Sequence, residues 1–148
     1  MTELDRILID TSAWIDFFSG RCEALSNRIR NAVNDNRVFT STLIVSELIS
    51  GAQTEEEAKG LEDKFFAFHR CAETLSTFIE AAHVRRQFLS QKHSLKKPGL
   101  ADCFIAVVAK KNRCSLLTCD SHFRDIKQYI DIPIFFFDRV KGRIQELS

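Results

Sequence analysis

The stretch Arg6-Ile7-Leu8-Ile9-Asp10-Thr11-Ser12 contains the strongest indication of the fold. Its three consecutive apolar residues, at positions 7–9, are typical of a strand that is covered on both faces of a parallel sheet. A carboxylate follows directly, and Thr11 or Ser12 can cap a helix that begins there. We therefore expect a strand at residues 6–10 that passes at once into a helix, as the first half of a βαβ unit.

The remainder of the chain repeats this alternation of short apolar runs and longer amphipathic stretches. Hydrophobic periodicity predicts helices at residues 11–18, 22–33, 42–50, 55–68, 77–91, 101–109 and 121–129. Apolar runs predict further strands at residues 38–39, near Cys71, at 115–118 and at 133–137. The one clear loop is Lys96-Lys97-Pro98-Gly99. This pattern favours one α/β domain that spans residues 1–148 and contains a mostly parallel sheet.

Composition narrows the class of protein. The chain has 148 residues, a length typical of one domain, and its 45% hydrophobic and 28% charged residues exclude a disordered chain. The net charge of +1 excludes a strongly basic nucleic-acid coat, but it allows a nucleic-acid enzyme with a local acidic cluster. No apolar run approaches the roughly 18 residues that span a bilayer, and the polar amino terminus is unlike a signal peptide. Five cysteines without metal-binding spacing are expected in the core of a cytoplasmic protein.

Four acidic residues lie at places where a carboxylate is costly unless something pairs with it. Asp10 ends an apolar strand, Glu47 lies within an apolar helix, Asp102 opens the most regular apolar helix, and Asp120 follows the strand at residues 115–118. The sequence offers no obvious buried Lys or Arg for any of them. In open α/β sheets, chemistry gathers beyond the carboxyl ends of the strands. We therefore expect the four side chains to converge at one edge of the sheet.

Four converging carboxylates would repel one another, so that either some pKa values rise or a divalent cation compensates the charge. Ligation by oxygen atoms suits Mg²⁺ or Mn²⁺ better than zinc. Such an ion lowers the pKa of bound water and neutralises charge in a phosphoryl transition state. The residues thus favour metal-assisted hydrolysis of phosphodiester bonds.

The acidic residues belong to four segments, which are Ile9-Asp10-Thr11-Ser12-Ala13-Trp14-Ile15, Ser46-Glu47-Leu48-Ile49-Ser50-Gly51, Ala101-Asp102-Cys103-Phe104-Ile105-Ala106 and Leu117-Thr118-Cys119-Asp120-Ser121-His122-Phe123. In this order, and over nearly the whole chain, the segments resemble the motifs of PIN-domain nucleases, especially the VapC-type toxins of bacterial toxin–antitoxin pairs. The third segment departs mildly, because Cys103-Phe104 stands where smaller or aliphatic residues are common. We attribute that difference to core packing.

The resemblance implies a PIN-like three-layer fold, with a central parallel sheet of about four or five strands and helices on both faces. It implies an endoribonuclease that uses Mg²⁺ or Mn²⁺, forms a homodimer and is neutralised by a small cognate antitoxin. Its metal-binding carboxylates would be Asp10, Glu47, Asp102 and Asp120. The reaction would need no covalent nucleophile, because a water activated by the metal attacks the scissile phosphate.

Further residues are expected either to support the site or to have no role in catalysis. Thr11, Ser12 and Thr118 would supply hydroxyls that hold the carboxylates or a water molecule. Lys96, Lys97 and Arg85 are candidates for contacts with RNA phosphates. By contrast, we expect His122 to be a surface residue at a helix start rather than a general base. The remaining acidic residues considered, expected at the surface or in turns, are Asp16, Asp125, Asp131 and Asp138.

Other readings of the same residues remain. A non-catalytic PIN-like module that binds RNA or protein would usually lack one of the four carboxylates, and none is missing. A phosphatase of the haloacid-dehalogenase type needs a second Asp two residues after the first, where Ser12 stands. A response-regulator receiver needs an acidic pair at the end of its first strand, but Thr11 follows Asp10. It also needs a Lys after a late strand, and none directly follows residues 115–118.

Overall fold

A computed structural model describes residues 5–89 and 97–148, and these form a six-stranded sheet with the order β3-β2-β1-β4-β5-β6. The first five strands along the chain run parallel, and the sixth runs antiparallel to β5. The strands are β1 (Ile7–Ile9), β2 (Val38–Thr40), β3 (His69–Arg70), β4 (Ser115–Thr118), β5 (Ile134–Asp138) and β6 (Arg143–Glu146). The mostly parallel sheet expected from the sequence is confirmed, and β6 is an addition to it.

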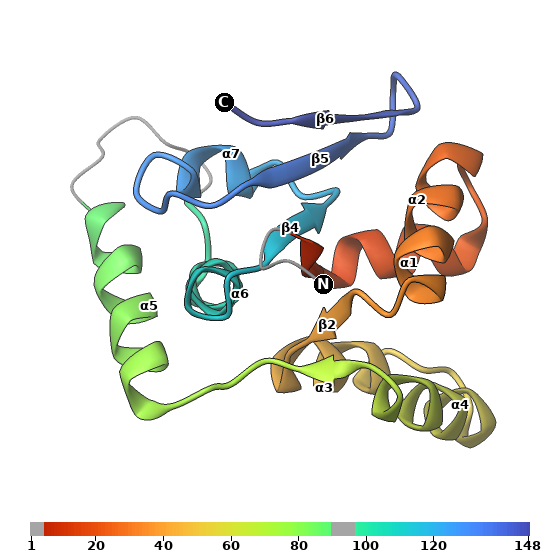
Figure 1. Ribbon diagram of the computed structural model, residues 1–148. Coiled ribbons are helices and arrows are strands. Elements are labelled where there is room, and N and C mark those ends of the chain that lie inside the picture. Colours follow the sequence, from red (N-terminus) through yellow and green to blue (C-terminus); the bar gives the residue numbers. More distant parts are fainter. Residues whose placement is uncertain (1–4, 90–96) are drawn as a thin grey trace.

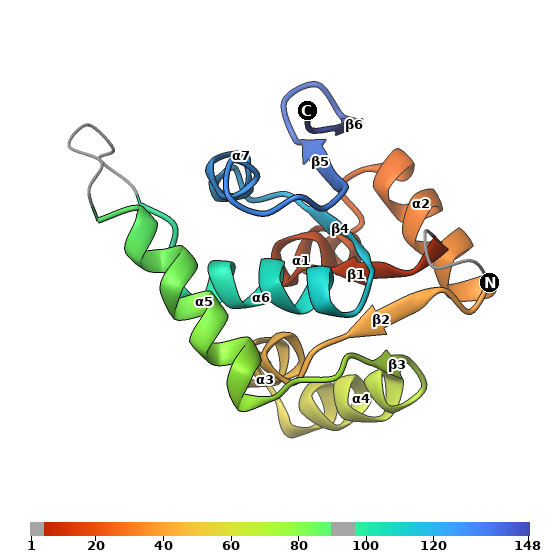
Figure 2. The same ribbon diagram turned by 60° about the vertical axis from the view of Figure 1, so that its left-hand side comes forward.

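Helices cover both faces of this sheet (Figures 1 and 2). They are α1 (Thr11–Ser19), α2 (Glu23–Asn34), α3 (Thr42–Ser50), α4 (Glu55–Phe66), α5 (Leu75–Gln87), α6 (Leu100–Lys111) and α7 (His122–Ile126). Helices α1 and α2 lie on one side, and α5, α6 and α7 lie on the other. Helix α3 packs against both α1 and α4. The layers are therefore helix, sheet and helix, as a parallel sheet with two buried faces requires.

The central strands β1 and β4 are neighbours, with Leu8 level with Leu116. The chain leaves β1 toward β2 and leaves β4 toward β5, in opposite directions across the sheet. Such a reversal is a topological switch point, and the crevice beyond the carboxyl ends of the strands at that point is the usual place for a site in an open α/β sheet.

The core lies between the central strands and the helices on either face. Helix α6 contributes a continuous buried stretch, Cys103 to Ala109, because it packs between the sheet and α5. On the other face, Trp14 of α1 meets Phe65 of α4 edge to face, with ring centroids 5.0 Å apart. The Trp14–Phe65 contact fixes α1, which carries the first acidic segment, against α4, which follows the second.

Several element boundaries differ from the sequence prediction for local reasons. Helix α5 begins at Leu75 because Thr74 and Thr77 form a reciprocal capping box. Helix α4 ends at Phe66 and α7 at Ile126, earlier than periodicity predicted. The strand β6 was not predicted, because its sequence Arg-Ile-Gln-Glu is mostly polar. The predicted helix end at residues 90–91 lies outside the described residues. Within the described ranges, no helix combines the length and the apolar character that crossing a bilayer requires.

Candidate metal centre

Asp10 directly follows β1 and is almost fully buried, with 7% of its surface exposed. Its Oδ2 accepts hydrogen bonds from the hydroxyls of Ser12 (2.8 Å) and Thr118 (2.9 Å). Ser12 lies in the first turn of α1, and Thr118 ends the neighbouring strand β4. The two hydroxyls therefore fix the carboxylate across the switch point between β1 and β4.

The same hydroxyls hold the loop that carries Asp120. The backbone N–H of Cys119 donates to Ser12 Oγ at 3.0 Å, and the N–H of Asp120 donates to Thr118 Oγ1 at 3.0 Å. Asp120 Oδ1 in turn accepts the backbone N–H of His122 at 2.9 Å. A continuous hydrogen-bond network thus joins Asp10 to Asp120 although the residues are far apart in sequence.

Asp102, in the first turn of α6, faces Asp120 across the ring of His122. His122 Nδ1 lies 3.2 Å from Asp120 Oδ1 and 3.5 Å from Asp102 Oδ2. One ligand atom from each of the three residues falls within 4.8 Å of the other two. His122 begins α7, as expected, but it is only partly exposed and its ring lies between two carboxylates of the site, which the sequence did not predict.

Glu47 lies at the rim of this cluster. It stands on the exposed side of α3, and the helix begins where Ser41 caps the N–H of Ile44 at 3.2 Å. Glu47 is nevertheless close enough to Asp10 for the two negative charges to interact. Thr11 faces Glu47 and favours its charged form, but its buried hydroxyl makes no hydrogen bond of good geometry with the described residues. The structure thus brings all four predicted carboxylates to one edge of the sheet.

The sequence matches the PIN domain family over residues 7–129. The chain belongs to the PIN domain family. No sequence among curated proteins matches it significantly.

Solved structures give the same fold for this PIN domain. A chain of VapBC2 from Rickettsia felis, in a crystal structure with a DNA fragment of its promoter, is 15% identical, with a TM-score of 0.65 over 89% of this chain and 98% of that one. A chain of DNA-bound VapBC from Salmonella typhimurium is 19% identical, with a TM-score of 0.66 over 87% and 96%. A chain of VapBC-1 from nontypeable Haemophilus influenzae is 19% identical, with a TM-score of 0.66 over 82% and 92%.

The pKa shifts in this PIN domain follow from burial and from repulsion among its carboxylates. Burial raises the pKa of Asp10, and the charge of Asp120 raises it further. Burial raises the pKa of Asp102 to about 6, the charges of Asp120 and Asp10 add to the effect, and His122 partly opposes it. Burial and the charge of Asp10 also raise the pKa of Glu47. The cluster therefore resists full ionisation in the absence of a compensating cation.

Oxygen atoms from closely spaced carboxylates are the donors that Mg²⁺ and Mn²⁺ prefer, and an imidazole nitrogen is acceptable to Mn²⁺. The closely spaced ligand atoms of Asp102, Asp120 and His122 fit such an ion in chemistry, and the nearby charge of Asp10 adds to the excess of negative charge. A divalent ion is therefore compatible with the residues present.

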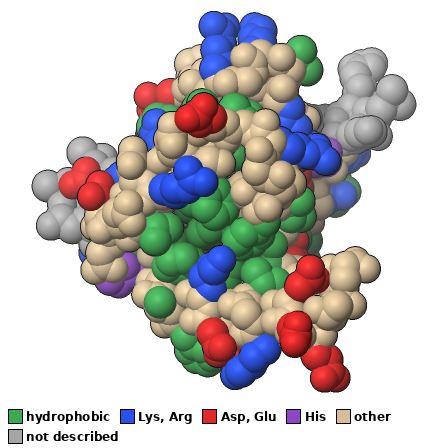
Figure 3. Space-filling view, turned by 90° about the vertical axis from the view of Figure 1, so that its right-hand side faces the viewer, with side chains coloured by type: hydrophobic (Ala, Val, Ile, Leu, Met, Phe, Trp, Pro, Cys, Tyr) green, Lys and Arg blue, Asp and Glu red, His purple; other side chains and the backbone are tan. Residues whose placement is uncertain are grey.

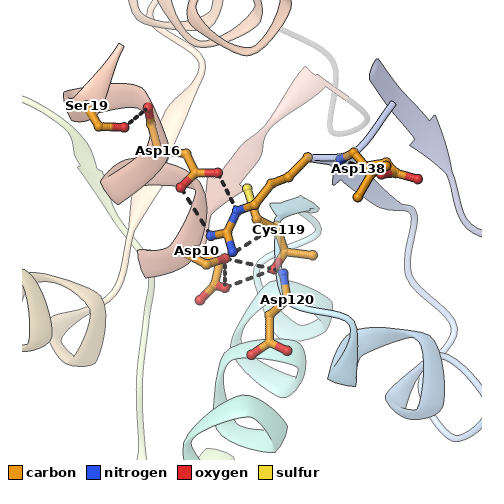
Figure 4. Close-up of polar contacts among 10 residues, drawn as sticks. Asp10, Asp16, Ser19, Cys119, Asp120 and Asp138 are labelled. Atoms are coloured by element: carbon orange, nitrogen blue, oxygen red, sulfur yellow. Dashed lines mark hydrogen bonds and ion pairs between the residues drawn. The ribbon is translucent and has the colours of Figure 1, made fainter. Parts of the chain in front are cut away.

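The burial of Asp16 differs from the sequence prediction. The residue was expected at the surface, but only 2% of its surface is exposed, and its carboxylate is bound by Arg139, with Nε–Oδ2 at 2.6 Å and Nη2–Oδ1 at 3.1 Å (Figure 4). Sequence periodicity gave no sign of this pair, because Arg139 lies 123 residues away. Asp131 is exposed beside Lys127, and Asp138 accepts backbone N–H groups in a turn, as expected. Asp125 is partly buried in α7.

Two of the three basic residues predicted to contact RNA lie within the described residues. Arg85 of α5 lies close enough to Cys103, next to Asp102, for its charge to act there, and its buried Nη1 has no hydrogen-bond partner among the described residues. Lys97 lies at the start of the loop before α6, with Nζ 3.5 Å from the carbonyl oxygen of Leu89. Lys96 lies outside the described residues.

Proposed function

We propose that this PIN domain, spanning residues 1–148, is a Mg²⁺- or Mn²⁺-dependent endoribonuclease that acts in the cytoplasm. The observation that carries the proposal is the convergence of Asp10, Asp102, Asp120 and His122 at the switch point, with Glu47 at the rim. The site offers no activated Ser or Cys nucleophile among the described residues, since its hydroxyls already hold Asp10. This favours hydrolysis by water over covalent catalysis.

Asp10, Asp102 and Asp120 would hold the ion, and Glu47 would reach it from the rim. A bound divalent ion would lower the pKa of a water molecule and offset negative charge on the phosphate. Ser12 and Thr118 keep Asp10 oriented through their hydroxyl groups. His122 Nδ1 lies between Asp102 and Asp120 and would add a nitrogen ligand to the ion. Arg85 and Lys97 would contact RNA phosphates on the side where α5 meets α6, and Lys96 is a further candidate for such a contact from the sequence alone.

Cleavage of labelled RNA in Mg²⁺ or Mn²⁺, compared with EDTA, tests this function. Asp102→Asn is expected to lower the cleavage rate by at least about 100-fold, because a ligand and its charge are lost at nearly constant shape. Asp131→Asn is the matched control, since Asp131 is exposed and forms a long ion pair with Lys127 at 3.9 Å, on another part of the chain from the cluster. Cleavage that persists in EDTA, or equal rates for the two variants, would contradict the proposal. RNA binding without cleavage would instead favour the non-catalytic module.

A groove beside Glu47 supports an antitoxin as partner. A cavity of about 690 Å³ lies among α1, α3 and α4. Its lining includes Ile15, Phe18, Leu48, Ala52, Leu61 and Lys64. Figure 3 shows apolar side chains gathered in a hollow on this face, with charged groups around it. An amphipathic helix binds in such a groove through its apolar side. The solved structures with this fold include several toxin–antitoxin complexes, which favours a cognate antitoxin as the occupant.

Co-expression with each small protein encoded by a gene adjacent to that of this chain tests the partner. Leu61→Glu is expected to abolish co-purification, because it places a charge in the apolar groove. Lys59→Glu changes a charge on the same helix, where Lys59 pairs with Asp63 at 3.2 Å outside the groove. Equal capture by both variants would exclude this groove as the antitoxin site.

Exposed apolar residues on the outer side of α5 support a homodimer. Leu75, Phe78 and Ile79 are exposed on this helix at helical spacing. Light scattering is expected to give twice the 17.0 kDa chain mass, and Ile79→Glu is expected to return it to the monomer value. A monomeric wild-type protein would exclude this arrangement.

A further inference from the structure

The pair formed by Asp16 and Arg139 is unequally exposed. Asp16 is almost fully buried on α1, whereas 51% of the Arg139 side chain is exposed. Two N–H groups of the guanidinium bind the two carboxylate oxygens. An arginine has five such donors, so donors remain that Asp16 does not use, and Cys119 lies close enough to interact with the same guanidinium. The buried carboxylate therefore holds an exposed cation in one orientation.

The backbone that carries Arg139 is also held. Arg139 directly follows β5, and Asp138 Oδ1 accepts the N–H groups of Val140 (2.9 Å) and Lys141 (3.1 Å). The turn closes with Gly142, whose φ of 65° is easily adopted by glycine and whose N–H bonds to the Asp138 carbonyl at 2.8 Å. Arg139 is thus fixed at its backbone by the turn and at its guanidinium by Asp16.

This cation lies at the same edge of the sheet as the acidic cluster. Strands β1, β4 and β5 are parallel neighbours, and Asp10, Asp120 and Arg139 each follow the carboxyl end of one of them. Cys119 directly precedes Asp120, and its N–H donates to Ser12 Oγ, which also binds Asp10. The charges of both Asp16 and Arg139 act on its thiol, so the pair lies near this part of the cluster. Figure 4 shows Cys119 and Asp10 near the middle of the view, with Asp16 on one side and Asp120 on the other.

We propose that Arg139 binds an RNA phosphate next to the scissile one and that Asp16 is its positioning residue. The proposal rests on the proposed ribonuclease function and adds the contact that brings the strand to the metal centre. A carboxylate cluster repels the phosphates on either side of the cleavage point, and a fixed guanidinium at its rim offsets that repulsion. The planar donor edge of arginine also matches two phosphate oxygens at once.

The main test measures RNA binding rather than cleavage. A labelled single-stranded oligouridine is titrated with the full chain in the cleavage-deficient Asp102→Asn background, at several salt concentrations and constant low Mg²⁺. The test variant combines Asp16→Asn with Arg139→Gln, which keeps a hydrogen-bonded pair of similar shape and leaves the net charge of the chain unchanged. The control is Arg30→Gln, which removes an exposed charge on α2 and lowers the net charge by one.

The double variant is expected to bind about fivefold more weakly, with the slope of log K against log salt smaller by about 0.7, the loss of one phosphate contact on a single strand. Arg30→Gln is expected to change neither the affinity nor the slope appreciably. If only net charge mattered, Arg30→Gln would weaken binding, and the double variant, whose net charge is unchanged, would bind like the wild type. Equal binding by wild type and double variant, or no binding of the oligouridine at low salt, would overturn the proposal.

The melting temperature of the double variant shows whether it is folded. A second variant, Arg139→Lys, tests the proposal if the double variant is not. Arg139→Lys keeps a cation beside Asp16 but loses the two-point donor edge. It is expected to keep the wild-type salt slope and to raise the KM for RNA cleavage several-fold at nearly constant kcat. An unchanged KM would contradict the positioning role of the guanidinium. A wild-type protein that binds RNA through Arg139 but never cleaves it would refute the ribonuclease function alone.

Discussion

Two buried threonines that each end a strand of the sheet differ in what their hydroxyls do. Thr118 ends β4, where its Oγ1 donates to Asp10 and accepts the N–H of Asp120. Thr40 ends β2, and its buried Oγ1 has no hydrogen-bond partner among the described residues. The contrast separates a hydroxyl that serves the metal centre from one that costs desolvation alone.

Thr118→Val is expected to lower the free energy of unfolding by about 1–3 kcal/mol, because it removes one of the two hydroxyl donors to the buried Asp10 and the acceptor of the Asp120 N–H. Thr40→Val is expected to be neutral or stabilising by up to about 1 kcal/mol, since valine has the same shape and no polar group to desolvate. Urea unfolding of both variants measures the difference. Similar losses for the two would mean that the Thr118 hydrogen bonds contribute little.

The raised pKa of Asp102 makes stability depend on pH in the absence of metal. The pKa is 3.8 when unfolded and about 6 when folded. The folded state therefore binds the proton more tightly, and this contribution is full below pH 3.8 and is lost as the pH rises through about 6. At pH 8 in EDTA, Asp102→Asn is expected to stabilise the protein by about 1–3 kcal/mol, with partial exposure keeping it below the full shift. Near pH 4 the two proteins should unfold alike in urea, and a pH-independent difference would contradict the assignment.

Residue positions were predictable where strand ends determine them. Asp10 and Asp120 each follow a strand, and neighbouring parallel strands bring their carboxyl ends together whatever the helices do. The Asp16–Arg139 pair was not predictable, because helical periodicity says nothing about a partner 123 residues away. His122 could have been suspected, since a residue two positions after a site carboxylate often donates its N–H to that carboxylate, as it does here.

At the scale of elements, two glycines have opposite expected effects. Gly20 ends α1 with a φ of 65°, and Gly60 lies within α4 with no neighbouring atom near an added Cβ. Gly20→Ala is expected to cost about 1–2 kcal/mol, because alanine is strained in the left-handed region. Gly60→Ala is expected to add about 0.5–1 kcal/mol by favouring the helix. Thermal unfolding should show shifts of opposite sign, and shifts of the same sign would contradict the analysis.

Most elements were predictable because their apolar residues recur with one period and their ends carry capping residues. Ser41 before α3 and Thr54 before α4 both accept the N–H three residues on. The exception is β6, which pairs with β5 through its backbone although only Ile144 is an apolar residue in it. Backbone pairing of an edge strand leaves no periodic signal when one face contacts solvent and the strand is four residues long.

At the scale of the whole molecule, metal binding should couple to folding. A divalent ion that binds the folded cluster at about 100 times its Kd adds about 2.7 kcal/mol of stability. For a chain of this size that raises the melting temperature by roughly 5–10 °C. Calorimetric scans with Mg²⁺ or Mn²⁺ are expected to show this rise for wild type and Asp131→Asn but not for Asp102→Asn. A rise of equal size in Asp102→Asn would place the ion elsewhere.

The sheet ends in two short strands, β3 with two residues and the antiparallel β6 with four. An incoming strand could form only a few main-chain hydrogen bonds with β3, and on the other border it would meet Arg143 and Glu146 of β6. Self-templated growth into fibrils and recruitment of other chains by strand addition are both disfavoured. Recognition by this protein must therefore be encoded in side chains on its helices and loops, where substitution can change specificity without disturbing the sheet.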